Sequence, residues 1–276
     1  MKPRVMSLVI FTCVVGLLIA PVQVNFFTAT FALLSVALGA GGAGALNMWY
    51  ESDIDALMKR TCLRPIPAGK VSRRHALIFA ILTSFFAVSS LYYFSNFLSA
   101  VMLTITILFY VLIYTIWLKQ RTPQNIVIGG VAGAFPPIIG WTIATGTITL
   151  EPILLFLIIF FWTPSHFWAL SLYKTEDYNN AKIPMLPVVS GIKTTKINIF
   201  VYAIILFFIS ITPYFFDYSG ITYLVSSVLL GSYYVYLCYK LLVGKDDDKI
   251  IAKKIFVYSI LYLFLIFVII LIDNIL

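Results

Sequence analysis

The chain has 276 residues, of which 61% are hydrophobic and only 11% are charged, and its mean hydropathy is +0.99. This composition excludes an ordinary water-soluble domain, because apolar runs approaching the ~20 residues that cross a bilayer recur along the whole chain. The net charge of +8 is not a nucleic-acid signal, since no basic helix or aromatic–basic module accompanies it. We expect an all-α polytopic membrane protein with one membrane domain over residues 1–276.

Nine apolar segments are predicted to be transmembrane helices. In chain order they cover residues 5–22, 27–50, 76–94, 97–118, 126–143, 153–172, 197–216, 221–243 and 255–272. An inner N-terminus puts all 19 Lys and Arg residues in inner segments and none in outer ones. Because Lys and Arg accumulate in cytoplasmic loops, this pattern predicts a cytoplasmic N-terminus and cytoplasmic polar loops. The lack of an amphipathic transit peptide favours a bacterial cytoplasmic membrane.

The chain turns hydrophilic after the second segment. Asn47, Glu51 and Asp55 are spaced i, i+4 and i+8, so on a helix they form one stripe that advances by about 40° per step. Mg²⁺ is typically held by one or two carboxylates together with phosphate oxygens of a substrate. The stripe therefore predicts a metal site, against the alternative of a helix cap and a hydrated loop. Asp53 would lie on the opposite side of a continuous helix.

Basic residues follow these carboxylates. Arg60 and Arg64 come first, and the planar guanidinium of Arg matches phosphate oxygens in bidentate fashion. Arg73, at the start of the next segment, is better explained by the excess of positive charge in cytoplasmic loops. Lys119 and Arg121 follow the fourth segment, where phosphate binding and the same charge bias are equally good explanations.

A second polar stretch follows the sixth segment. Glu176 and Asp177 could face the first acidic stripe across a shared cavity. His166 lies inside or near the end of the segment, where ionisable groups are costly and are usually functional. A structural histidine is the alternative. Pro164 is expected to kink the helix before the acidic pair.

Three blocks of the chain resemble a known family. The pattern Asn-x3-Glu-x3-Asp at residues 47–55 is similar to the first signature of the UbiA-type prenyltransferases, although Glu and a preceding Met stand where that signature often has Asp. Within this superfamily, residues 47–70, 114–141 and 162–191 resemble the heme O synthases. The third block, which begins Trp-Thr-Pro-Ser-His-Phe-Trp, is the most specific of the three.

The resemblance implies a nine-helix bundle with a central cavity open to the cytoplasmic face and to the lipid bilayer. It implies transfer of the farnesyl group of farnesyl diphosphate to a vinyl group of heme b, giving heme O, with a heme A synthase or terminal oxidase as a possible docking partner. The implied Mg²⁺ ligands and catalytic residues are Asn47, Glu51, Asp55 and Asp177, with Glu176 as a further ligand. The implied diphosphate-binding residues are Arg60, Arg64, Lys119 and Arg121, and His166 is the implied heme contact.

Two other functions remain open on the sequence. A related prenyltransferase could act on a quinone precursor or a chlorin, although residues 163–170 and 183–189 argue against it. A transporter would also carry intramembrane polar residues and Gly-interrupted helices, but its polar groups are expected near the membrane midplane. Here the charged groups gather at one predicted membrane face.

Overall fold

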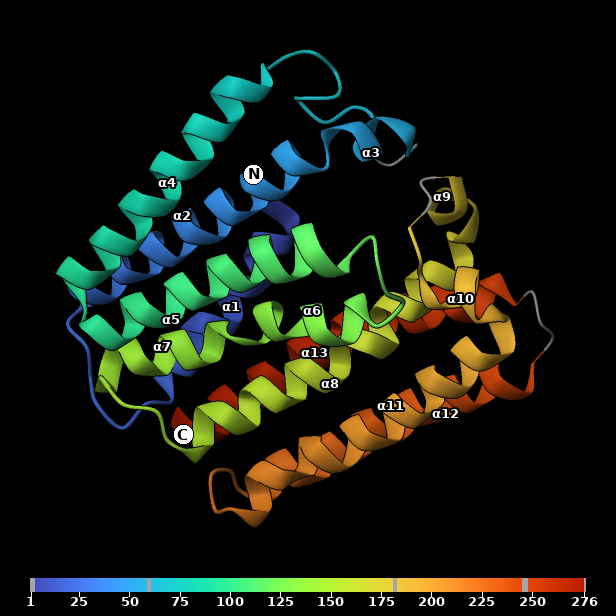
Figure 1. Ribbon diagram of the computed structural model, residues 1–276. Coiled ribbons are helices and arrows are strands. Elements are labelled where there is room, and N and C mark those ends of the chain that lie inside the picture. Colours follow the sequence, from blue (N-terminus) through green and yellow to red (C-terminus); the bar gives the residue numbers. More distant parts are fainter. Residues whose placement is uncertain (1–2, 59–60, 181–182, 245–247, 276) are drawn as a thin grey trace.

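The computed structural model describes residues 3–58, 61–180, 183–244 and 248–275, and this part of the chain is helical without strands (Figure 1). The prediction of an all-α protein is confirmed. The elements are α1 (Pro3–Leu18), α2 (Phe26–Tyr50), α3 (Ser52–Leu57), α4 (Arg73–Phe94), α5 (Phe97–Leu108), the π-helix η1 (Phe109–Leu118), α6 (Asn125–Ala134), α7 (Pro136–Thr145), α8 (Leu150–Tyr173), α9 (Thr175–Asn180), α10 (Leu186–Val189), α11 (Gly191–Phe215), α12 (Ile221–Val243) and α13 (Lys249–Ile275).

Eight helical stretches of the described residues are long and apolar enough to cross a membrane. Two of them combine neighbouring elements, since α5 continues into η1 and α6 continues into α7. The apolar part of α1, Met6–Leu18, is shorter, so the count of nine spans stays a prediction. Large apolar side chains such as Phe85 (72% exposed) and Tyr93 (81% exposed) cover the outside of α4, as expected for a lipid-facing surface.

The fifth predicted span is divided where the sequence places two prolines. Helix α6 ends at Ala134 and α7 begins at Pro136, because proline lacks the backbone N–H of a helix interior but is well suited to a first turn. Pro164, in contrast, lies inside α8, which is assigned as one helix from Leu150 to Tyr173. The predicted boundaries of the other spans agree with the helices to within a few residues, apart from the longer ends of α4, α11 and α13.

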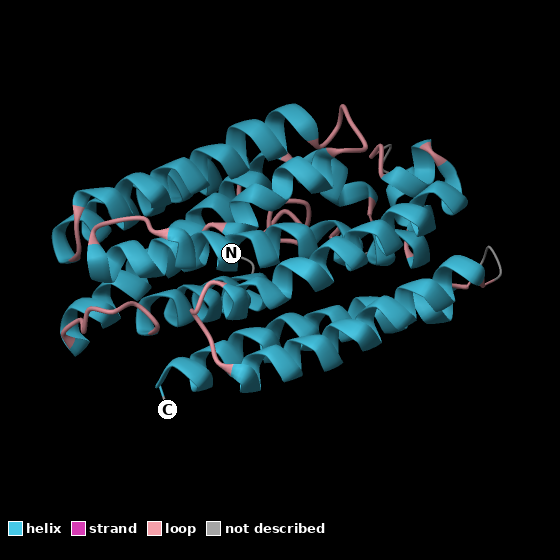
Figure 2. Ribbon diagram, turned by 90° about the horizontal axis from the view of Figure 1, so that it is seen from below, coloured by secondary structure: helices cyan, strands magenta, loops and turns pink. Residues whose placement is uncertain are grey.

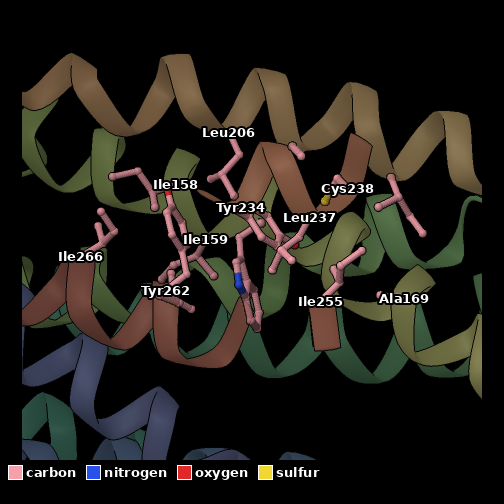
Figure 3. Packing of buried hydrophobic residues seen from close by; sticks show 14 of the residues in the cluster. Ile158, Ile159, Ala169, Leu206, Tyr234, Leu237, Cys238, Ile255, Tyr262 and Ile266 are labelled. Atoms are coloured by element: carbon pink, nitrogen blue, oxygen red, sulfur yellow. The ribbon is translucent and has the colours of Figure 1, made fainter. Parts of the chain in front are cut away.

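The long helices run side by side (Figure 2) and enclose two large apolar cores. One core, formed mainly by α1, α2, α4, α5 and α7, fills the N-terminal half. The other fills the C-terminal half, where α8, α11, α12 and α13 meet (Figure 3). Its members include Ile158, Ile159, Ala169, Leu206, Tyr234, Leu237, Cys238, Ile255, Tyr262 and Ile266.

Helices α1 and α7 approach each other closely through glycine. A Cβ atom at Gly140 would lie within 3.0 Å of the Cys13 carbonyl oxygen, and one at Gly16 within 3.0 Å of the Pro137 carbonyl oxygen. Both obstacles are backbone atoms, so a side chain could be accommodated only by moving the helices apart. Small residues at helix contacts permit such close packing in membranes.

We expect Gly140→Ala to destabilise the fold by about 1–3 kcal/mol, the usual cost of overpacking a well-packed interior. Thermal unfolding of the purified protein in detergent measures this as a lowered midpoint. The matched control is Gly133→Ala in α6, where an added Cβ meets no atom within 4 Å. Equal unfolding midpoints for the two variants would contradict the close contact of α1 with α7.

One end of the bundle carries most of the polar residues discussed above, and we call it the polar end. Helices α3, α9 and α10 lie there, next to the end of α8 (Figure 1). A small apolar cluster connects these elements, with Ile54 and Met58 packed together with Tyr178 and Met185. The two acidic stretches, far apart in sequence, are therefore brought to the same end of the molecule.

Candidate active site

The first acidic stripe crosses a junction between two helices. Helix α2 ends at Tyr50 and α3 begins at Ser52, with Glu51 between them. The backbone N–H of Glu51 donates to the Asn47 carbonyl oxygen (3.0 Å), and that of Asp55 donates to the Glu51 carbonyl oxygen (2.8 Å). Because these i to i+4 bonds continue through the junction, the three residues keep their helical spacing. All three side chains are buried, with exposures of 0% for Asn47, 2% for Glu51 and 3% for Asp55.

Glu51 is paired with a lysine that lies 68 residues further along the chain. The Lys119 Nζ donates to Oε2 of Glu51 at 2.6 Å and lies 2.5 Å from Oε1. Both oxygens are therefore within ion-pair distance of the Lys119 ammonium. The buried carboxylate of Glu51 is thus neutralised by a lysine from a distant part of the chain.

Asp55 forms a second buried ion pair. The Arg64 Nη1 lies 2.8 Å from Oδ1 and 2.6 Å from Oδ2 of Asp55. The Thr61 hydroxyl donates to the Asp55 carbonyl oxygen at 2.9 Å, which holds the returning loop against α3. Burying a carboxylate is costly unless it is paired and hydrogen-bonded, so these contacts allow Asp55 to lie inside the protein.

The side chain of Asn47 is held by the π-helix. Its Nδ2 donates to the Thr115 Oγ1 at 3.0 Å, and that hydroxyl donates to the Tyr110 carbonyl oxygen five residues back at 2.8 Å. The backbone N–H of Lys119 likewise donates to the Tyr114 carbonyl oxygen at 2.9 Å. The wide winding of η1 therefore presents Thr115 and Lys119 to the acidic stripe, and π-helical segments are frequent at functional sites.

We expect Thr115→Val to lower activity by about tenfold, because losing a buried hydrogen bond costs roughly 1–3 kcal/mol and Asn47 would change its orientation. Thr115→Ser keeps the hydroxyl and should restore most of the loss. The control is Thr106→Val, because the Thr106 hydroxyl donates to the Met102 carbonyl oxygen in its own helix, at 2.7 Å. Steady-state assays of the three variants, with unfolding midpoints, test this, and equal rates for Thr115→Val and Thr106→Val would argue against the role of Thr115.

Asp53 and Arg73 form a separate, exposed pair. The Arg73 Nη2 lies 2.9 Å from Oδ2 of Asp53, with side-chain exposures of 52% and 83%. Although α2 ends before Asp53, the Asp53 side chain is exposed, whereas the side chains of the stripe are buried. The interpretation that Asp53 lies outside the metal stripe agrees with this position.

The second acidic pair lies on α9 at the same end. Glu176 is exposed and Asp177 is half-buried. Neighbouring Tyr178 packs in the small cluster with Ile54 of α3. Within the described ranges, three or more Asp, Glu, His or Cys side chains do not come together closely enough to hold a metal ion. The pair is thus near the stripe in the fold, but a shared ligand set stays a prediction.

One of the predicted phosphate-binding residues is not part of the buried cluster, and the position of another is not described. Arg121 is exposed just after η1, two residues beyond Lys119. Arg60 lies outside the described residues. Of the four predicted cations, the structure therefore brings Arg64 and Lys119 into contact with the acidic stripe.

His166 lies in α8 with 6% of its surface exposed. Its ring is stacked between Trp162 (4.2 Å between ring centroids) and Phe256 (4.6 Å). Its Nδ1 lies 2.6 Å from the Ser259 Oγ. The sequence indicated a buried polar residue here, but it gave no signal for Ser259 or Thr115, since a hydroxyl on an apolar helix is common and its partners are 93 and 68 residues away.

An apolar helical bundle with buried ion pairs at one end defines an integral membrane protein with a polar site. Residues 9–260 match the UbiA prenyltransferase family. A protoheme IX farnesyltransferase from Pelagibacter ubique (strain HTCC1062) is 64% identical over 279 residues, covering 100% of this chain and 92% of that protein. A second from Bartonella bacilliformis is 56% identical, covering 99% and 88%. The chain belongs to the UbiA prenyltransferase family, which confirms the resemblance.

Solved structures share the fold. A structure of digeranylgeranylglyceryl phosphate synthase gives a TM-score of 0.82 at 17% identity, covering 99% of this chain and 95% of that one. A UbiA homolog from Archaeoglobus fulgidus bound to GPP and Mg²⁺ gives 0.67 at 16% identity, covering 97% of both chains. These similarities support a UbiA-type bundle.

Proposed function

We propose that this protein transfers the farnesyl group of farnesyl diphosphate to a vinyl group of heme b, giving heme O and diphosphate. The observation that carries the proposal is the high identity, along the whole chain, with relatives named protoheme IX farnesyltransferase. The buried carboxylate and cation pairs at the polar end support a site for a metal-bound diphosphate. The proposed setting is a bacterial cytoplasmic membrane with the N-terminus and polar end on the cytoplasmic side.

The residues of the stripe fit Mg²⁺. Asn47 can supply an amide oxygen, Glu51 a buried carboxylate, and Asp55 a second buried carboxylate. Two carboxylates suffice, because Mg²⁺ usually completes its octahedral shell with water and substrate phosphate oxygens. Asp177 and Glu176 are the proposed further ligands from the second acidic pair. When bound, Mg²⁺ would neutralise charge that develops on the leaving diphosphate.

In this proposal, the two cations that pair with the stripe also bind the diphosphate of the substrate. Lys119 and Arg64, now bonded to Glu51 and Asp55, would turn to the diphosphate oxygens when the carboxylates bind the metal. Arg121, which is exposed, would add a contact from the rim, and Arg60 is a further proposed phosphate contact. Once they contact the diphosphate, these cations would stabilise the negative charge that develops in the transition state.

The proposed reaction begins with cleavage of the allylic C–O bond, and the electron pair leaves with diphosphate. The farnesyl carbon then bonds to the terminal vinyl carbon of heme, which moves the positive charge to the carbon next to the ring. Water adds there and loses a proton, giving a hydroxyethylfarnesyl group. His166 is the proposed heme contact, and a heme A synthase or terminal oxidase is the proposed consumer of heme O.

Mass spectrometry of hemes tests the function. The chain is expressed in a bacterial strain that lacks its own heme O synthase, and conversion of heme b to heme O is the expected result. An unchanged heme profile together with a new prenylated quinol or chlorin would show that the acceptor is a quinone precursor or a chlorin and not heme. If the purified Asp177→Ala variant turns over at the wild-type rate, then Asp177 is not a ligand of the metal.

A further inference from the structure

A cavity of about 180 Å³ lies at the end of the bundle opposite to the polar end. The ends of α7, α11 and α13 and the start of α8 gather there (Figure 1). The lining residues that carry polar side chains are Trp141, Glu151, Asp217, Tyr218 and Asn274. One water molecule takes up about 30 Å³ in the liquid, so the cavity has room for a small polar group.

Two buried polar atoms of the lining residues have no hydrogen-bond partner among the described residues. One is Nε1 of Trp141, whose side chain is almost fully buried at 3% exposure, and the other is Oε2 of Glu151. Buried donors and acceptors in native proteins nearly always have a partner, because leaving them unpaired is costly. An indole N–H only donates and a carboxylate only accepts. The missing partner must therefore supply both an acceptor and a donor.

This end of the molecule also lacks a cation for Glu151. The ranges 122–173, 197–239 and 255–276, which form most of the cavity walls, contain no Lys or Arg. The ion pairs found in the described part of the chain all belong to the polar end. A buried carboxylate is costly unless a positive charge accompanies it. A water molecule would bridge the donor and the acceptor but would not bring this charge.

A primary ammonium group fits the cavity better than a metal ion. Within the described ranges, three or more Asp, Glu, His or Cys side chains do not come together closely enough to hold a metal. A metal would also leave the indole N–H of Trp141 without an acceptor. An ammonium group has three N–H donors, and Glu151 and Asp217 line the cavity as acceptors for them. A phosphate oxygen on the same ligand would accept from Trp141.

The cavity connects to the outer surface of the bundle. A second hollow of about 600 Å³ shares Asp217, Tyr218 and Asn274 with it, so the two adjoin. Phe215, which is 66% exposed, also lines this second hollow. Exposed aromatic side chains at the ends of membrane helices are typical of the membrane–water interface, where lipid headgroups lie. A headgroup can therefore enter from the side while its acyl chains stay in the bilayer.

We propose that this cavity binds a phosphoethanolamine group, the headgroup of phosphatidylethanolamine in the surrounding bilayer. Its ammonium donates to Glu151 and Asp217, and its phosphate accepts from Nε1 of Trp141. The site is separate from the proposed reaction, because α8 begins at the cavity and ends at the polar end. That helix has 24 residues and is about 36 Å long. A lipid held here joins the ends of α7, α8, α11 and α13.

Lipids that differ only in headgroup methylation test the site. Delipidated full-length protein in detergent is given phosphatidylethanolamine, its N,N-dimethyl derivative or phosphatidylcholine, all with the same acyl chains. The headgroups carry the same charges, but the number of N–H donors falls to none along the series. Native mass spectrometry measures lipid binding, and thermal unfolding measures stabilisation. We expect wild type to bind phosphatidylethanolamine about tenfold more tightly than phosphatidylcholine, as for the loss of a charge-assisted hydrogen bond.

Three variants assign the preference to the cavity. Glu151→Gln conserves the shape of the side chain and should abolish the preference, and Trp141→Phe should weaken binding of phosphatidylethanolamine severalfold. Asp53→Asn, which removes a carboxylate from the exposed pair at the polar end, should keep the wild-type preference. If Trp141→Phe does not fold, the nearly isosteric Glu151→Gln still decides the outcome.

Equal binding of the methylated and unmethylated lipids by wild type, or a preference that survives Glu151→Gln, overturns the proposal. Stabilisation of lipid-free protein by Ca²⁺ that disappears in Glu151→Gln would identify a metal site and also overturn it. Free O-phosphoethanolamine distinguishes the two sources of the ligand. Stabilisation by the lipid alone supports a headgroup site, whereas equal stabilisation by the free compound would overturn the lipid as its source.

Discussion

Asp55→Asn is expected to lower the rate of prenyl transfer by about 10²–10³-fold, comparable to removing one charge-stabilising group from an active site. Asparagine conserves the volume of the side chain but removes the negative charge that contacts Arg64 through both oxygens. The variant loses a proposed metal ligand, and Arg64 loses its charged partner in the free enzyme. The measurement is heme O formation by purified enzyme at saturating Mg²⁺.

The same change two residues away is the control. Asp53→Asn also removes one carboxylate from α3, but Asp53 is 83% exposed and its pair with Arg73 is at the surface. Exposed ion pairs contribute about 0–1 kcal/mol, so the rate should stay within a fewfold of wild type. A comparable loss in both variants would mean that α3 acts through its net charge, and the specific role of Asp55 would be wrong.

The helices and the acidic stripe could be predicted because both depend on local spacing. Asn47, Glu51 and Asp55 keep the i, i+4, i+8 relation even though α2 ends between them, since backbone hydrogen bonds continue across Glu51. The division of the fifth span could have been expected from Pro136, whose position after Phe135 begins α7.

The partners within the site could not be predicted from the sequence. Several cations follow the stripe, and local spacing does not decide that Lys119 bonds to Glu51 while Arg121 remains at the surface. That choice depends on the register of η1 against α2, and a π-helical segment has the same apolar composition as an α-helix. The contact of His166 Nδ1 with the Ser259 Oγ likewise depends on the packing of α13 on α8.

At the proposed site, the two ion pairs predict that metal and diphosphate bind cooperatively. In the free protein Glu51 is engaged by Lys119, and Asp55 by Arg64. A metal ion that binds alone must displace the cations, and a diphosphate that binds alone must compete with the carboxylates. Both free-energy penalties are offset when the two ligands bind together. Each displaced cation then contacts the diphosphate, and each displaced carboxylate contacts the metal. By linkage, each ligand should increase the affinity for the other.

Lys119→Met is expected to make the unfolding midpoint of the protein depend on Mg²⁺, which the loss of a purely structural salt bridge would not do. Removing one partner of a buried ion pair typically costs about 3–5 kcal/mol, because the other charge is left uncompensated. The unfolding midpoint measured in EDTA should therefore fall. Mg²⁺ alone should then restore much of it, since Glu51 is available to the metal and ligand binding stabilises the folded state. Turnover should stay about 10²-fold or more below wild type, because the diphosphate has lost a cation.

Unfolding midpoints in EDTA, in Mg²⁺ and in Mg²⁺ with an unreactive farnesyl diphosphate analogue measure this coupling. Wild type should respond weakly to Mg²⁺ alone and strongly to the combination, and Lys119→Arg, which keeps the positive charge, should behave similarly. Arg73→Met, which breaks the exposed pair with Asp53, should leave all three midpoints nearly unchanged. If Lys119→Met is destabilised to the same extent with and without Mg²⁺, then Lys119 only neutralises a buried carboxylate, and Glu51 does not bind the metal.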